Sequence, residues 1–79
     1  MKSLHKALDV LEYVVKKDGL PSTPAEIADA LDLNSPTCVR ILIDWVQRGY
    51  LIQISRRTGY IPGPMIFTFT GRNWPYADL

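Results

Sequence analysis

Two proline-marked helix starts lie twelve residues apart in this chain of 79 residues, and they limit its fold more than any other feature. In the first, Thr23-Pro24-Ala25-Glu26, a capping hydroxyl precedes a proline and a glutamate that can bond back to the cap. In the second, Ser35 is expected to cap a helix whose first residue is Pro36. The first helix then has room for only about two turns before Asp32-Leu33-Asn34. Two such helices joined by a short turn form a helix-turn-helix.

Another helix is predicted before this pair and a β-hairpin after it. The first helix, expected from a cap at Ser3 to about Lys17, has apolar residues at the i, i+3, i+4, i+7 spacing of one helical face: Leu4, Ala7, Leu8 and Leu11. The helix that starts at Pro36 is expected to reach Arg48 and to close at Gly49. Residues 50–55 have the composition of a strand, 56–59 that of a turn, and 60–61 begin a return strand. The predicted fold is mainly α with a small β-hairpin, a three-helix winged helix-turn-helix.

Size and composition limit the domain organisation and the chemistry. We assign residues 1–66 to one domain and 67–79 to a tail or to the start of a linker to a C-terminal domain that this chain lacks. Residues 65–70 fit a strand, a helix start or a linker. A single cysteine, Cys38, and a single histidine, His5, exclude an intrachain disulfide and a Cys/His zinc cluster.

No cofactor or metal is expected, and no enzymatic activity, because the chain has no glycine-rich phosphate loop and no paired carboxylates to form a site. No apolar run approaches the ~18 residues of a membrane span. We therefore expect a cytoplasmic protein.

Charge is distributed unevenly, although the net charge is only +1. Residues 1–34 contain four lysines and six acidic residues, a net charge of −2, whereas residues 35–72 contain five arginines and one acidic residue, a net charge of +4. The planar guanidinium of arginine matches phosphate groups and guanine edges. The second half therefore favours a polyanionic partner.

The chain resembles the N-terminal DNA-binding domain of the IclR (isocitrate lyase regulator) family of bacterial transcription factors. The resemblance covers about residues 4–66 and rests on segments 4–11, 26–31, 37–42, 49–51 and 59–63. It implies duplex DNA as the partner, transcription regulation as the function, and a homodimer formed through the first helix or through segments beyond this chain. A small-molecule effector is implied only if a sensing domain follows. The chain departs from the family at Asp32, Pro36, Cys38 and Trp45, where glycine, a polar residue, valine and leucine are common.

The third helix is the candidate reading element. Its apolar residues cover an arc of about 200° at 100° per residue, so we expect neighbours on several sides of it. The remaining strip is polar and consists of Thr37, Arg40, Asp44, Gln47 and Arg48. Because Asp44 would repel phosphates, only the first two turns are expected to enter the major groove.

The predicted DNA-binding residues are Ser35, Pro36, Thr37, Val39 and Arg40 on this helix, and Arg56 and Arg57 at the hairpin tip. Some have simpler interpretations. Ser35 caps a helix in any case, Arg40 can pair with Asp44 on the helix surface, and the two tip arginines can simply solubilise a turn.

Three other residues are expected to be structural or inactive: Cys38 and Trp45 in the core, and His5 without a metal.

The leading prediction is sequence-specific binding of double-stranded DNA, with the third helix in the major groove and the hairpin on the backbone or minor groove. A winged helix used for protein–protein contact is the alternative. It is favoured by the low net charge and by Val39 and Ile43 at the edge of the apolar arc.

Overall fold

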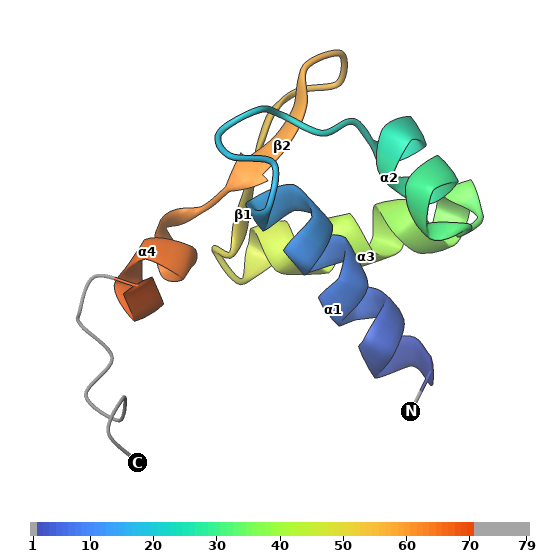
Figure 1. The fold of residues 1–79 in the computed structure, drawn as a ribbon, viewed down its shortest axis with the longest axis horizontal. Coiled ribbons are helices and arrows are strands. Elements are labelled where there is room, and N and C mark those ends of the chain that lie inside the picture. Colours follow the sequence, from blue (N-terminus) through green and yellow to red (C-terminus); the bar gives the residue numbers. More distant parts are fainter. Residues whose placement is uncertain (1, 71–79) are drawn as a thin grey trace.

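The computed structural model describes residues 2–70 and confirms the winged helix-turn-helix, with three helices followed by an antiparallel hairpin (Figure 1). The elements are α1 (Lys2–Val15), α2 (Pro24–Leu31), α3 (Ser35–Gln47), β1 (Leu51–Ser55), β2 (Gly59–Pro62) and α4 (Pro64–Thr70). Helix α1 crosses α3, and α2 follows a loop that runs beside the hairpin.

The limits of α1 differ from those predicted. Ser3 lies inside the helix, so it is not the N-cap, and the helix ends at Val15 rather than at Lys17. The earlier end has a backbone cause, because Asp18 and Gly19 adopt positive φ angles of 58° and 86°. Such left-handed conformations end a helix, and just before them the Lys17 N–H bonds to the oxygen of Val14, three residues back instead of four, at 3.3 Å.

The core lies where the three helices meet the hairpin. Its buried apolar residues come from α1, α2, α3, β1 and β2: Val10, Val14, Ile27, Ala28, Cys38, Leu42, Leu51 and Tyr60. Trp45 packs against this cluster and donates its indole N–H to the backbone oxygen of Ala7 at 2.9 Å. The bond joins α3 to α1 across 38 residues of sequence, which confirms Trp45 as a core residue.

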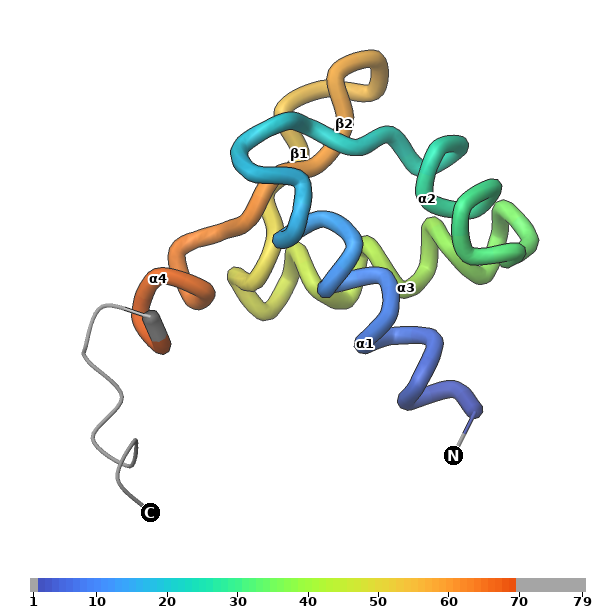
Figure 2. Tube along the Cα trace, in the orientation of Figure 1, coloured from blue at the N-terminus to red at the C-terminus, as the bar shows by residue number. Residues whose placement is uncertain are grey.

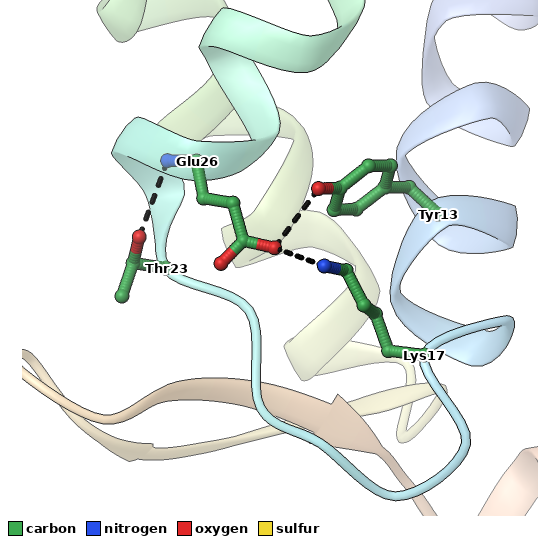
Figure 3. Close-up of polar contacts among 4 residues, drawn as sticks. All are labelled: Tyr13, Lys17, Thr23 and Glu26. Carbon is green, nitrogen blue, oxygen red and sulfur yellow. Dashed lines mark hydrogen bonds and ion pairs between the residues drawn. The ribbon is translucent and has the colours of Figure 1, made fainter.

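The start of α2 is fixed by the predicted capping box and by contacts with α1 (Figure 3). The Thr23 hydroxyl accepts a hydrogen bond from the Glu26 N–H at 3.2 Å. The Glu26 carboxylate accepts from the Tyr13 hydroxyl at 2.9 Å and pairs with the Lys17 ammonium at 2.7 Å.

These partners lower the pKa of Glu26; Lys17 contributes most, Tyr13 next, and a backbone hydrogen bond from Thr23 least. Because the folded-state pKa is lowered, their stabilisation is present near neutral pH. It is lost as the pH falls through that lowered pKa.

We expect Thr23→Ala to lower the free energy of unfolding by ~0.5–2 kcal/mol, because the cap bond to Glu26 is lost. Urea denaturation followed by circular dichroism measures the change. Ser3→Ala is the matched control, since the exposed Ser3 lies within α1 and caps nothing. Equal stability of the Thr23 variant and the wild type would contradict the capping role.

An antiparallel bridge joins the hairpin to the loop before α2, in addition to the core contacts of Leu51 and Tyr60. The backbone of Tyr60 in β2 exchanges hydrogen bonds with Ser22, in the loop before α2, at 3.0 and 2.7 Å. Gly59 has a φ of +105°, and a Cβ there would collide with the Ser22 backbone, so only glycine fits. In Figure 2 this loop runs beside the hairpin, whose turn projects away from the helices.

Residues 64–70 form α4, so of the alternatives open for this segment the helix is correct. The ring of Phe69 lies 5.9 Å from that of Tyr50, at the junction of α3 and β1. The predicted domain boundary at residue 66 falls inside α4, which continues to Thr70. The boundary stays a prediction. Most of the proposed tail, residues 71–79, lies outside the described residues.

Candidate nucleic-acid interface

Helix α3 is capped by Asn34, not by Ser35 as predicted. The Asn34 side-chain oxygen accepts a hydrogen bond from the Thr37 N–H at 2.9 Å, and Asn34 itself is extended, with φ −73° and ψ 153°. Ser35 is therefore the first helical residue and Pro36 the second. Both Asn and Ser are strong caps, and the usual place of proline at the first position favoured Ser35.

Capping by Asn34 changes which groups at the start of α3 can bind a ligand. Pro36 has no N–H, and the N–H of Thr37 is already bonded to Asn34. The capping oxygen is supplied by Asn34, which leaves the exposed Ser35 hydroxyl for other partners. Backbone amides therefore contribute little here, and side chains must supply most of any phosphate contact.

The turn before α3 contains a left-handed residue at Asp32, where glycine is common in the family that the chain resembles. Asp32 caps the end of α2 in the left-handed conformation, with φ 55° and ψ 48°. The N–H of Leu33 bonds to the oxygen of Ala28 at 2.9 Å, which closes the turn. An aspartate at this position thus adopts the conformation that a glycine would have provided.

The outer face of α3 carries both polar and apolar side chains. Four exposed residues share one line along the helix at the i, i+4, i+7, i+11 spacing: Pro36, Arg40, Ile43 and Gln47. The described residues form ion pairs between Lys16 and Glu12 and between Lys17 and Glu26. Arg40 is in neither pair, so the predicted alternative, an Arg40–Asp44 pair, is not formed.

The buried arc of α3 is narrower than the sequence analysis expected. Cys38 and Leu42 are buried, and Ile41, Trp45 and Val46 are partly buried. Val39 and Ile43 remain 38% and 48% exposed, so this side of the helix has no covering element among residues 2–70. The apolar arc on the sequence includes both residues, but α1, α2 and the hairpin pack on the other sides.

Cys38 is confirmed as a core residue. Its thiol donates to the backbone oxygen of Pro24 at 3.6 Å, and burial raises its pKa. A buried thiol with a raised pKa is a poor nucleophile and a poor metal ligand. Within the described part of the chain, no three His, Cys, Asp or Glu residues are placed to hold a metal ion.

A basic hollow of about 370 Å³ lies between the start of α1 and the first turns of α3. Its lining residues are Lys2, Ser3, Lys6, Thr37, Arg40 and Ile41. Thr37 and Arg40 are among the residues predicted from the sequence to bind DNA, whereas the two lysines are not. Their i, i+4 spacing puts Lys2 and Lys6 on one face of α1, but only the crossing of α1 over α3 brings that face to Arg40.

The other predicted arginines, Arg56 and Arg57, lie exposed in the turn at the hairpin tip. The turn is closed by Ser55, whose hydroxyl donates to the Thr58 hydroxyl and accepts from the Thr58 N–H, both at 2.9 Å. The tip is thus a defined turn that presents two cations at the far end of the wing, separate from the hollow beside Arg40.

Comparison with known proteins supports this arrangement. The IclR helix-turn-helix domain matches residues 3–55, from α1 through β1. The chain belongs to the IclR family. This confirms the resemblance that the segments in α1, α2 and α3 indicated. Comparison with curated protein sequences gave no significant match.

A solved structure shares the IclR-type fold. It is the crystal structure of an IclR transcriptional regulator from Alicyclobacillus acidocaldarius, which is similar over 99% of this chain with a TM-score of 0.82 and 26% sequence identity. The present chain spans 31% of the length of that regulator.

No helix among residues 2–70 is long and apolar enough to cross a membrane.

Proposed function

We propose that this IclR-type domain binds double-stranded DNA in a sequence-specific way and acts in transcription regulation. In this proposal α3 enters the major groove and the wing contacts the backbone or the minor groove. The observation that carries it is the exposed face of α3, with Arg40 free of ion pairs among the described residues, in a winged helix-turn-helix of the IclR family. Such helices read base edges with their first turns.

The residues divide into two roles. Arg40 has the fork geometry that bonds two guanine acceptors, and it lies one turn after Pro36 on the exposed line. In this proposal the hydroxyls of Ser35 and Thr37 and the ammonium groups of Lys2 and Lys6 contact phosphates. Its support is that Thr37, Lys2 and Lys6 line the hollow beside Arg40. Val39 adds an apolar contact, while Asp44 limits how deeply the later turns enter.

Dimerisation and ligand control are part of the same proposal. Leu4 and Leu8 are 51% and 39% exposed on α1, which favours a homodimer formed through this helix. Control by a small molecule requires a sensing domain, and such a domain would need about 100 residues or more. The proposed place of action is the bacterial cytoplasm, where the DNA lies.

A salt titration tests DNA binding directly. The affinity for a duplex should fall linearly in a log–log plot against salt, with a slope near −0.9 per phosphate contact. The alternative function, a protein–protein module, is favoured by the net charge of +1 and by the exposed Val39 and Ile43. A slope near zero would favour that alternative.

We expect the double variant Arg56→Ala with Arg57→Ala to bind all duplexes more weakly by a similar factor. Phosphate contacts carry little sequence information, so the log–log salt slope should flatten by about one to two units. The control replaces both arginines with lysine, which keeps the charge and should keep the slope. An unchanged slope in the alanine variant would remove the wing from the interface.

A further inference from the structure

One side of α3 is not covered by any described element. Its side chains are apolar and lie next to Arg40, the cation that we assign to DNA contact. On the helix, Ile43 lies about 60° from Arg40 and Val39 about 100° from it, on the same side. Ile43 therefore belongs to the middle of the exposed face, in line with Pro36 and Gln47, rather than to an edge of the core. Its 48% exposure, and the 38% of Val39, leave both side chains open to a partner.

The charges around these residues indicate which partner that is. Arg40 lies between Val39 and Ile43 in the sequence, and the hollow beside it is lined by Lys2 and Lys6. An apolar protein surface laid over Val39 and Ile43 would desolvate this cationic group without compensating it. A major groove supplies phosphates for the cations and one apolar group at its floor, the C5-methyl of thymine.

We propose that Val39 and Ile43 read thymine methyl groups in the major groove, so that the preferred site contains thymines beside the guanine contacted by Arg40. This inference rests on the proposed DNA binding, and it takes α3 slightly further into the groove than its first two turns, because Ile43 begins the third turn. Asp44 lies about 100° around the helix from Ile43, so it does not share the line of Pro36, Arg40 and Ile43. Four residues of α-helix rise about 6 Å, close to two base-pair steps of about 3.4 Å each. The two side chains therefore reach methyl groups about two steps apart.

The test uses the full 79-residue chain and base analogues. Duplexes that bind best are selected from a randomised library, and each thymine in the selected site is replaced in turn by deoxyuridine. This replacement removes the methyl group and keeps the base pairing and the charge. At two positions about two steps apart, we expect affinity to fall about four-fold, the change that corresponds to one buried methyl-sized group.

Alanine variants connect each methyl group to a side chain. In Val39→Ala the uracil effect should disappear at one position, and in Ile43→Ala at the other, as expected for directly interacting pairs. Leu20→Ala, which alters a side chain that is 66% exposed in the loop between α1 and α2, should leave both effects intact. All three sites are on the surface, so the variants are expected to fold.

Two results would overturn the inference. If uracil replaces every thymine without loss of affinity, or if the loss persists in both α3 variants, Val39 and Ile43 do not read methyl groups and the exposed side serves another partner. A library that yields no preferred sequence would instead contradict the proposed function, and the thymine contacts with it.

Discussion

Leu42→Ala is expected to remove most of the protein's stability at room temperature. Leu42 is fully buried in α3, in the cluster where the three helices meet the hairpin. Removing a buried leucine side chain costs ~2–5 kcal/mol, because the transfer free energy is lost and a cavity is left behind. A core of this size provides a stability of only ~3–5 kcal/mol. Urea denaturation followed by circular dichroism measures the shift.

The neighbouring residue gives a matched control for this prediction. Ile43→Ala removes a similar number of atoms from the next position of the same helix, but the side chain is 48% exposed. Surface substitutions of this kind change stability by only about 0.5 kcal/mol or less. Equal destabilisation by the two variants would show that α3 is rotated about its axis relative to the described structure.

Arg40→Ala is expected to cost ~1–3 kcal/mol of binding free energy on the preferred site and to relax specificity at one position. The reason is that a bidentate contact to guanine distinguishes that base from the other three. Measuring the affinity for the selected duplex and for its single-base variants separates this effect from a general loss. Folding is not at risk, since Arg40 is exposed and alanine favours helices.

Arg48→Ala is the matched control for Arg40. Arg48 is also exposed, but it caps the C-terminal end of α3, more than one turn beyond the part expected in the groove. Its loss should leave base preference unchanged. If Arg40→Ala weakens binding to every sequence equally, Arg40 contacts a phosphate. Its position in the hollow with Lys2 and Lys6 would then explain such a contact.

Local sequence signals predicted the order of elements well. The caps, prolines and glycines between Thr23 and Gly49 act over four residues or fewer, so the two helices of the helix-turn-helix and the turn at Asp32 are largely determined locally. The strand and turn composition after Gly49 indicated the hairpin. Local signals were least reliable where two neighbouring residues could both cap, as at Asn34 and Ser35.

The interface depended on contacts that a linear sequence does not contain. The crossing of α1 over α3 decides that Lys2 and Lys6 lie beside Arg40. The packing of α1, α2 and the hairpin decides that the side of α3 with Val39 and Ile43 stays uncovered. The apolar arc on the helical wheel includes both Leu42 and Ile43, with Ile43 at its edge, and only the packing shows that the first is buried and the second is 48% exposed. The sequence alone determined the elements from α1 to β2 and their order, since caps and periodicity are local; tertiary packing decided which side of α3 was left for a partner.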